Sequence, residues 1–382
     1  MNVPRRRNLV DVPTPIRCDS VELRRIALPL VEPFRTATGT VTVRDLLLVR
    51  ITADGVEGWG ECAALPEPTY TAEDVAGAQR VLTDHLVPRL FAAGPVTPEG
   101  LAGVLRDVRG HPMAKAALEL ALLDAEGRAT GRSLAARLGA TRDRVAAGVS
   151  VGLLAPDALL ARVDDYVAAG YRRVKLKVQP GADHGPAAAV RARHPDLALQ
   201  VDANGAYTRD DATTLAALDD LGLLMIEQPL ADDDLVGHAE LARVVRTPLC
   251  LDESIASVHA AETAFALGAC RIVNVKPGRV GGYLEAVRLH DLCRARAVPV
   301  WCGGMLESGI GRAANVALAA LPGFSLPGDL SASDRYYERD VVTAPFVLDD
   351  GHLTVPTGPG LGVTVDLDVV ESFTTAVEVL RP

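Results

Sequence analysis

Hydrophobic and polar positions alternate along two early segments of the chain, a pattern typical of β-strands with one buried face. These segments span residues 20–30 and 45–55, and a polar loop over residues 31–42 joins them. Further along, residues 72–90 and 111–131 place their apolar side chains at helical spacing. Strands followed by helices predict an α+β unit in the first third of the chain.

From about residue 145 the pattern changes to short apolar runs that alternate with amphipathic segments. Polar markers near the ends of five runs are spaced by 25, 25, 25 and 24 residues, and they are Lys177, Asp202, Glu227, Asp252 and Lys276. This period predicts a parallel β/α repeat, and about eight such strands close a barrel. An open doubly wound sheet is the competing architecture, but the glycine-rich phosphate loop that usually marks it is missing after the first run.

Composition limits the classes of partner and the compartment. The net charge of −10 argues against nucleic acid as a partner, since phosphate binding needs a basic surface. No apolar run approaches the roughly 20 residues of a membrane helix, and residues 1–15 lack the apolar segment of a secretory signal. None of the six cysteines forms a C-x-x-C pair, which indicates free thiols in a reducing compartment. We therefore expect a cytoplasmic protein with neither nucleic acid nor membrane as a partner.

Three acids suggest a metal site, because barrel enzymes carry their active sites at the carboxyl ends of the strands. Asp202, Glu227 and Asp252 end the predicted third, fourth and fifth strands, so their carboxylates are expected to converge. They would repel one another without a cation, and ligation by oxygen alone points to a hard divalent ion such as Mg²⁺. The alternative is that each acid caps the helix after its strand, but the common spacing favours the metal site. Glu253 is expected to point the other way along its strand, in a supporting role.

Lysines on the predicted second and sixth strands suggest bases on either side of a substrate. Lys175 and Lys177 share one face of their strand, and the apolar residues around them suit the helix-packed outside of a barrel. Most such pairs lie on a solvated edge, but the position next to a metal-bearing strand favours a functional role. Lys276 ends the sixth strand, opposite the second in an eight-stranded barrel.

This arrangement suits removal of a proton next to a carboxylate, since a metal would stabilise the enediolate that forms. A lysine can act as the base only if its pKa falls from about 10.4 toward neutrality. The metal, a second ammonium group and partial burial are expected to lower it. Arg279 either exerts a similar effect on Lys276 or binds a loop carbonyl or acid, and both roles stay open.

Five motifs, in this order and spacing, resemble those of the enolase superfamily, muconate-lactonizing subgroup: K-x-K, V-D-A-N, I-E-Q-P, L-D-E-S and N-V-K-x-x-R-V-G-G. The resemblance runs from about residue 18 to the C-terminus. The stretches VWCGGMLESGIGRAAN and LPGDLSASDRYYERDVV look like the o-succinylbenzoate synthase / N-succinylamino acid racemase family. Dipeptide epimerases of the subgroup tend to carry D-x-D at the eighth strand, where this chain has FSLPGD. Mandelate-racemase-like members use a His–Asp pair in place of the second lysine.

The resemblance implies an α/β fold, a (β/α)7β TIM-like barrel with an α+β capping domain. The cap would comprise residues 18–140, completed by about 335–382, and the barrel would comprise residues 141–334. Cap loops around residues 33–40 and 65–71 would close over a small carboxylate substrate. Members of the subgroup are often oligomeric, so a homo-oligomer is expected.

The resemblance also implies site roles. The metal would be Mg²⁺, for which Mn²⁺ or Co²⁺ can substitute, held by Asp202, Glu227 and Asp252. Lys177 and Lys276 would be the acid/base residues, with Lys175 supporting Lys177. Substrate-lining and supporting residues would be Ser150, Asn204, Arg279, Gly304, Met305 and Glu307.

Two activities remain open within the family. In o-succinylbenzoate synthesis, a dehydration of 2-succinyl-6-hydroxy-2,4-cyclohexadiene-1-carboxylate in the menaquinone pathway, Lys177 would act as the single base and Lys276 electrostatically. In N-succinylamino acid racemisation both lysines would act, one on each face, and Arg279 slightly favours this competence. We expect the synthase activity, with the racemase activity beside it. The alternative is a dedicated N-acyl- or N-succinylamino acid racemase.

Two hypotheses from other classes compete with this one. A Schiff-base aldolase would use a barrel lysine without a metal. A non-catalytic barrel would act as a binding or scaffold protein, but it gives no reason for lysines inside the barrel.

Overall fold

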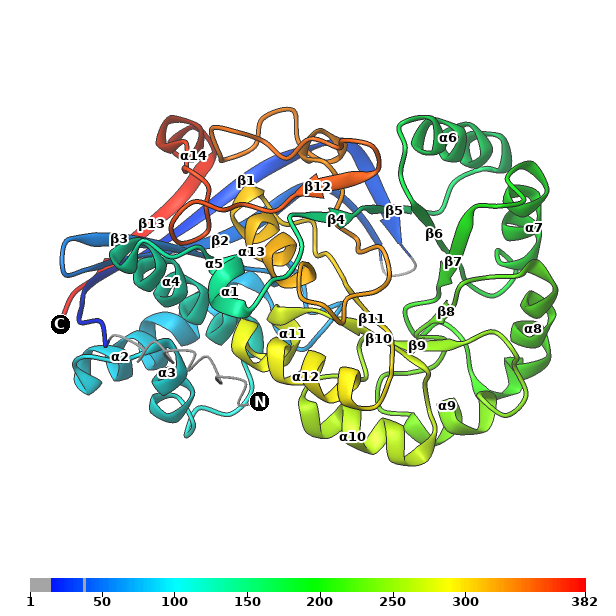
Figure 1. The fold of residues 1–382 in the computed structure, drawn as a ribbon, viewed down its shortest axis with the longest axis horizontal. Coiled ribbons are helices and arrows are strands. Elements are labelled where there is room, and N and C mark those ends of the chain that lie inside the picture. Colours follow the sequence, from blue (N-terminus) through cyan, green and yellow to red (C-terminus); the bar gives the residue numbers. More distant parts are fainter. Residues whose placement is uncertain (1–14, 37–38) are drawn as a thin grey trace, which may run out of the picture.

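The computed structural model describes residues 15–36 and 39–382. The prediction that no secretory signal is present at the N-terminus falls on residues outside this part, as does the tip of the predicted cap loop at residues 37–38. The chain forms an antiparallel sheet with helices and a curled parallel sheet ringed by helices (Figure 1).

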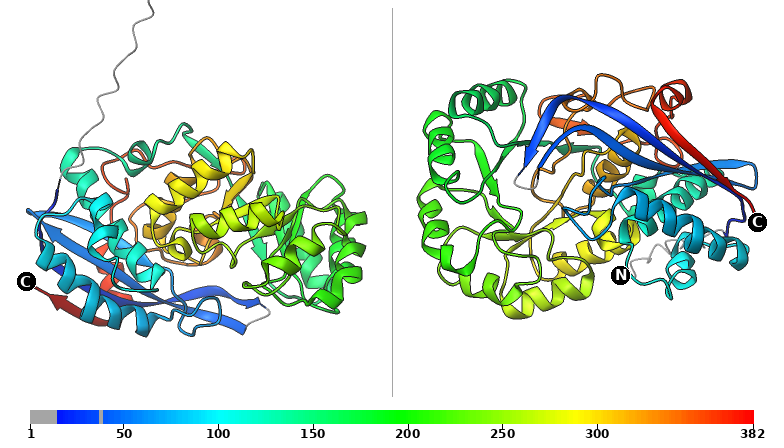
Figure 2. Two further views of the ribbon diagram at one scale, coloured as in Figure 1. Left: turned by 90° about the horizontal axis from the view of Figure 1, so that it is seen from below. Right: turned by 180° about the vertical axis from the view of Figure 1, so that it is seen from behind.

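The antiparallel sheet has the strand order β13-β1-β2-β3. Its strands are β1 (Cys18–Thr36), β2 (Gly39–Ala53), β3 (Val56–Cys62) and β13 (Thr374–Leu380). The alternation predicted for the first strand is present in β1, where Val21 and Leu23 are fully buried and the residues beside them are not. In β2 it is not, since all four residues from Leu46 to Val49 are fully buried. The last strand of the chain pairs with the first, with Val21 opposite Leu380. The C-terminal stretch therefore lies against the N-terminal sheet, as the sequence predicts (Figure 2).

Helices cover one face of this sheet. They are α1 (Val75–Val81), the π-helical turn η1 (Leu82–Leu86), α2 (Val87–Ala93), α3 (Pro98–Val104), α4 (Pro112–Thr130) and α5 (Leu134–Leu138). The long helix α4 packs so closely on β3 that a Cβ atom at Gly60 would lie 2.0 Å from the carbonyl oxygen of Ala117. Glycine at this position therefore allows the helix and the sheet to pack in direct contact.

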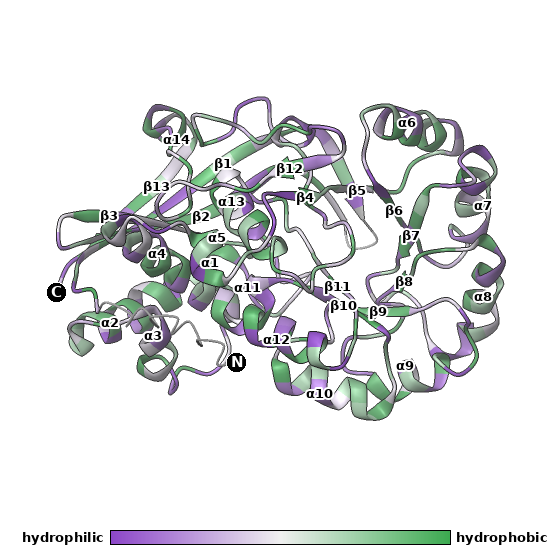
Figure 3. Cartoon of the chain, in the orientation of Figure 1, coloured by the Kyte–Doolittle hydropathy of each residue, from purple (hydrophilic) through white to green (hydrophobic). Residues whose placement is uncertain are grey.

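The parallel sheet has seven strands in the order β11-β10-β9-β8-β7-β6-β5. They are β5 (Gly148–Val151), β6 (Arg173–Lys177), β7 (Ala198–Asp202), β8 (Ile226–Glu227), β9 (Leu249–Leu251), β10 (Ile272–Val275) and β11 (Val300–Cys302). The helical segments between and after them are α6 (Pro156–Ala168), α7 (His184–Arg193), η2 (Arg209–Asp211), α8 (Ala212–Ala216), η3 (Ala217–Leu221), α9 (Leu235–Leu241), α10 (Val258–Leu267), α11 (Pro277–Val280), α12 (Tyr283–Ala295) and α13 (Gly309–Ala319). Figure 3 shows both hydrophobic (green) and hydrophilic (purple) segments on the helices around this sheet.

The segment predicted as the eighth strand closes the barrel without forming a continuous ladder. Phe324 bridges to Val300 of β11, and Gly328 bridges to Ala147 immediately before β5. Proline at position 327 has no N–H to donate, which limits the ladder that this segment can form. The backbone N–H of Asp329 then donates to the carbonyl of Cys302, 2.9 Å away, which fixes the end of the segment next to β11.

The remaining elements lie in the C-terminal part of the chain. They are η4 (Ser333–Arg335), β12 (His352–Thr354), which pairs with β4 (Arg144–Ala146), and α14 (Leu367–Phe373). Within the described residues, no helix combines the length and apolar character needed to cross a membrane. All six cysteines are buried and free.

The barrel strands divide their side chains between two environments. Val174 and Leu176 of β6 belong to the core between the strands and the helices, while Lys175 between them faces the barrel interior. There the indole of Trp301 lies beneath the Lys175 ammonium group, 5.0 Å from the ring centroid. The predicted inward direction of the lysine is confirmed, and its ammonium group is attracted by the face of the indole ring.

Candidate active site

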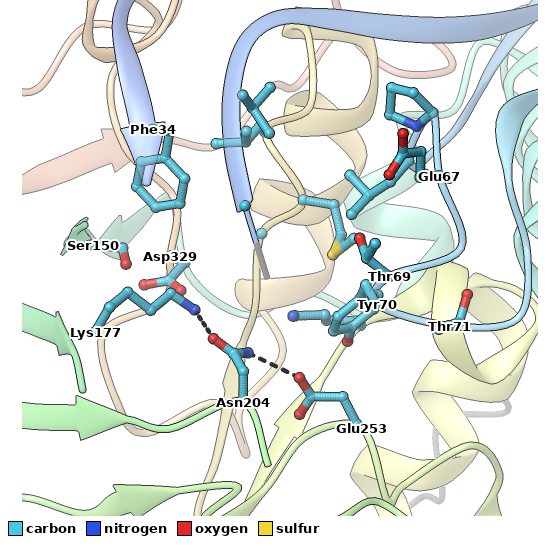
Figure 4. A pocket seen from close by; sticks show the side chains of 18 of the residues that line it. Phe34, Glu67, Thr69, Tyr70, Thr71, Ser150, Lys177, Asn204, Glu253 and Asp329 are labelled. Atoms are coloured by element: carbon cyan, nitrogen blue, oxygen red, sulfur yellow. Dashed lines mark hydrogen bonds between the residues drawn. The ribbon is translucent and has the colours of Figure 1, made fainter. Parts of the chain in front are cut away.

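A cavity of about 720 Å³ opens at the carboxyl ends of the barrel strands, beneath two loops of the cap (Figure 4). Its lining includes Phe34 near the end of β1, Gly39 and Thr40 at the start of β2, where the sequence predicts a loop, and residues 65–72 of the second predicted loop. Both loops predicted to lie over the substrate therefore border the cavity, apart from residues 37–38, which fall outside the described chain. Barrel side chains form the opposite wall, including Lys175, Lys177 and Lys276.

The three acids predicted as metal ligands lie at neighbouring strand ends. Asp202 and Glu227 are partners in the register of β7 and β8, and Asp252 follows β9. All three are at most 1% exposed. They do not cap the helices that follow, because Thr208, Asp234 and Ser257 do so for η2, α9 and α10. The helix-cap alternative is therefore wrong.

Lysine ammonium groups lie between these carboxylates. Lys175 Nζ is 3.0 Å from Asp202 and 3.1 Å from Glu227, and Lys177 Nζ is 2.7 Å from Asp202. Lys276 Nζ is 2.8 Å from Asp252. The lysines thus cover the acids, which lie beneath the cavity surface.

Asp202 and Glu227 meet at one ammonium group, that of Lys175, while Asp252 pairs with Lys276, so the convergence of all three acids on one ion stays a prediction. In residues 15–36 and 39–382 no three acidic, histidine or cysteine side chains gather as a ligand set. The chemistry of the donors nevertheless fits a hard divalent cation, since all are carboxylates. Burial first, and then the charge of Asp202, raises the pKa of Glu227 to about 8. A bound cation would relieve this repulsion.

Two opposing effects act on the pKa of Lys276. Burial lowers the pKa of its ammonium group, but the adjacent charge of Asp252 raises this pKa by a larger amount. The net pKa therefore lies well above its ordinary value. At Lys175 burial again lowers the pKa, and the nearby charge of Asp202 contributes most to raising it, so the net pKa lies above its ordinary value. Direct ion pairs outweigh burial at both lysines.

Arg279 lies behind Asp252 and does not line the cavity. Its Nη1 donates to Asp252 and, at 3.2 Å, to the hydroxyl of Tyr70. Its Nε donates to the carbonyl of Ile255, 2.8 Å away. Arg279 therefore takes the second of the two roles left open by the sequence, since it binds a loop carbonyl and an acid.

The other predicted substrate residues border the cavity. Ser150 lies on β5 opposite Lys175 in register, and its hydroxyl is buried without a partner among the described residues. Gly304 and Met305 follow β11, and the backbone N–H of Met305 donates to the Glu307 carboxylate at 2.8 Å. Asn204 accepts a hydrogen bond from Lys177 Nζ.

Sequence reasoning missed two residues of the site. Asp329 accepts from Lys175 and Arg173, each 2.6 Å away, and Tyr70 places its ring 4.3 Å from Lys276 Nζ while its hydroxyl donates to Asp252 at 3.0 Å. Asp329 had a usable signal, since it ends the eighth barrel segment. Tyr70 had none, because nothing periodic marks a loop of the cap.

The prediction that Glu253 points away from the site is wrong. Strand β9 ends at Leu251, so the alternation of side chains does not continue through the turn that holds Glu253. The side chain lines the cavity and its carboxylate accepts from Asn204 Nδ2 at 2.9 Å. Burial first, and then the charge of Asp252, raises the pKa of Glu253 to about 7.

Replacing Asp329 by asparagine is expected to lower the free energy of unfolding by about 3 kcal/mol, because buried Lys175 and Arg173 lose the carboxylate that they share. Urea denaturation measures the effect. The matched control is Asp349→Asn, which breaks an exposed pair with Arg144 and is expected to change stability by at most about 1 kcal/mol. Equal losses in the two variants would contradict a structural role for the buried cluster.

Known protein families match both the barrel and the N-terminal part of the chain. The enolase C-terminal domain-like family matches residues 158–369, and the mandelate racemase / muconate lactonizing enzyme N-terminal domain matches residues 20–139. The chain belongs to the enolase superfamily. The predicted family resemblance and the predicted fold class are both confirmed. The chain is thus an enzyme of the enolase superfamily type, and enzymes of this superfamily use a divalent metal ion.

Several relatives are similar over almost their full length. An N-succinylamino acid racemase from Amycolatopsis sp is 56% identical, covering 94% of this chain and 98% of that protein. An o-succinylbenzoate synthase from Geobacillus kaustophilus is 47% identical, covering 94% and 96%. The crystal structure of an enolase superfamily member from Listeria innocua Clip11262 has a TM-score of 0.93 and 42% identity, covering 96% of this chain and 99% of that chain.

Proposed function

We propose that the enzyme removes the proton next to a carboxylate, with o-succinylbenzoate synthase activity and N-succinylamino acid racemase activity at one site. The observation that carries the proposal is the pair of lysines, Lys177 of β6 and Lys276 after β10, which reach one cavity from opposite sides of the barrel above three buried acids. Relatives with each of the two names support both activities. A dedicated N-acyl- or N-succinylamino acid racemase is the alternative.

The metal ligands in this proposal are Asp202, Glu227 and Asp252, and the ion is Mg²⁺, for which Mn²⁺ or Co²⁺ can substitute. A divalent ion held there would supply positive charge for the substrate carboxylate and would compete with the lysines for the acids. Gln200 and Asn274 support the ligand role of Glu227, since their amide groups donate to its two oxygens at 3.2 and 2.8 Å. These contacts hold the carboxylate in one orientation.

In the dehydration, Lys177 acts as a free amine and takes the α-proton of the cyclohexadiene carboxylate. The electrons of the broken C–H bond move into the enediolate, and the C–O bond on the same face then breaks. Lys177 returns its proton to the departing hydroxyl, which leaves as water. The amine is thereby regenerated, and Lys276 stabilises negative charge from the other side.

In the racemisation, one lysine removes the α-proton and the other delivers a proton to the opposite face. The ring of Tyr70 and the carboxylate of Asp252 hold the Lys276 ammonium group in place on its side of the cavity. Ser150, Gly304, Met305 and Glu307 form the wall against which the acyl group would lie.

The wider organisation of the protein is part of the proposal. Residues 18–140 with about 335–382 form the cap and residues 141–334 form the barrel. We propose further that the enzyme assembles as a homo-oligomer, acts in the cytoplasm and takes a small carboxylate as its substrate.

A paired assay tests the function. Dehydration of the cyclohexadiene precursor and deuterium exchange into both enantiomers of an N-succinyl amino acid are measured with Mg²⁺, after treatment with EDTA, and after Mg²⁺ is restored. Both activities are expected to fall to background with EDTA and to recover with the ion, because the enediolate then lacks its counter-charge. Activity that survives EDTA and is abolished by borohydride with substrate would instead indicate a Schiff-base lysine.

A further inference from the structure

Three side chains form a hydrogen-bonded series across the mouth of the barrel, from β6 to the turn after β9 (Figure 4). Lys177 Nζ donates to Asn204 Oδ1 at 2.5 Å, and Asn204 Nδ2 donates to Glu253 Oε1 at 2.9 Å. The lysine proposed as the base of one face is thus connected to a carboxylate that has no role in the proposed reaction.

The chemistry of the two end groups determines which way the amide of Asn204 faces. An ammonium group can only donate hydrogen bonds, and a carboxylate can only accept them. The Asn204 amide satisfies both only with its oxygen toward Lys177 and its nitrogen toward Glu253. In the flipped orientation the NH₂ group would face the ammonium group and the oxygen would face the carboxylate, and both contacts would be repulsive.

The backbone of Asn204 leaves this side chain few alternatives. Its φ angle is 45°, in the left-handed region that asparagine tolerates, and its N–H donates to Asp202 Oδ1 at 3.1 Å. The next residue, Gly205, donates to the carbonyl of Gln228 at 2.8 Å. With the main chain held on both sides, the orientation of the amide depends on its two partners, Lys177 and Glu253.

We infer that Glu253 is a positioning residue, which acts through Asn204 to hold the Lys177 amine against one face of the substrate. The inference rests on the proposed function and adds to it a device that serves one of the two faces. Lys276 makes none of the hydrogen bonds of the series, since its own contacts are with Asp252 and Tyr70. The charge of Glu253 reaches Lys276 only through space, where it adds to the effect of Asp252 in raising the pKa of that lysine. Loss of Glu253 should therefore affect the two faces unequally.

Deuterium exchange into each enantiomer of an N-succinyl amino acid, measured with Mg²⁺, tests the inference. Lys177→Ala and Lys276→Ala first establish which enantiomer depends on which lysine. Glu253→Ala is expected to slow exchange of the Lys177-dependent enantiomer by about tenfold to a hundredfold, the range for a misplaced catalytic group, and to change the other by less than about twofold. Glu253→Gln is expected to recover most of the loss, because its amide oxygen still accepts from Asn204.

A crystal structure of Glu253→Ala supplies a readout that does not depend on turnover. The Lys177 Nζ to Asn204 Oδ1 distance is expected to exceed 3.5 Å in the variant, the limit for a hydrogen bond. Equal slowing of both enantiomers, or an unchanged distance with unchanged exchange, overturns the positioning role. Failure of Glu253→Gln to recover exchange shows that charge rather than orientation matters, and it overturns the role as well. If the unaltered enzyme neither exchanges nor dehydrates, the proposed function itself fails.

Discussion

Replacing Lys177 by alanine is expected to lower the rate of dehydration by about 10³-fold or more. In the proposed reaction one amine both removes the α-proton and protonates the departing hydroxyl, so its loss removes two acid/base contributions, each worth about 10²–10⁴-fold. The kcat of dehydration with Mg²⁺ measures the effect. The loss is expected in kcat, because substrate binding would rest mainly on the metal and on the cavity wall.

The chain offers a matched control for this variant. It contains only four lysines, and three of them line the cavity. The fourth, Lys115 on α4, donates to the carbonyl of Val108 and lies away from the cavity. Lys115→Ala is expected to keep dehydration within about twofold of the unaltered enzyme. A small loss in Lys177→Ala, similar to that of the control, would falsify the one-base mechanism and favour a non-catalytic barrel.

Replacing Lys276 by alanine is expected to slow deuterium exchange for one enantiomer of the racemase substrate and not for the other. Exchange of deuterium into one enantiomer of an N-succinyl amino acid should fall by about 10²-fold or more, because its proton is reached only from the Lys276 side. Exchange into the other enantiomer should persist, since Lys177 still removes its proton. Proton NMR of each enantiomer in D₂O with Mg²⁺ measures both rates.

Lys177→Ala provides the reciprocal control, with the sensitivity of the two enantiomers exchanged. Net racemisation should be lost in both variants, because inversion needs an acid and a base on opposite faces. Equal slowing of the two enantiomers in Lys276→Ala would argue against a two-base arrangement. It would leave the synthase as the better description of the site.

The sequence predicted the fold class and much of the site because both depend on regular features. A parallel barrel brings the carboxyl ends of its strands to one rim. Polar residues that recur every 25 residues at strand ends can therefore be assigned to that rim. The inward direction of Lys175 followed from strand alternation in the same way. Each of these features depends on the chain immediately around the residue.

Where regular structure stops, the predictions failed. Glu253 lies in a turn, where alternation carries no information, and its direction was predicted wrongly. The eighth segment was compared only with the D-x-D motif, which it lacks, so the acid at its end, Asp329, was overlooked. The sequence also did not show which acid contacts Lys276, and the structure places Asp252 there.

By itself, therefore, the sequence determined the kind and order of the groups at the rim of the barrel: three acids, the lysines of two opposite strands and the motifs of the superfamily. Only the tertiary structure decided which of these groups touch. It brought Tyr70 from the cap onto Lys276, Asp329 from the last barrel segment onto Lys175, and Glu253 onto the amide that holds Lys177. These contacts join residues far apart in the chain through loops whose conformations have no period, so folding alone establishes them.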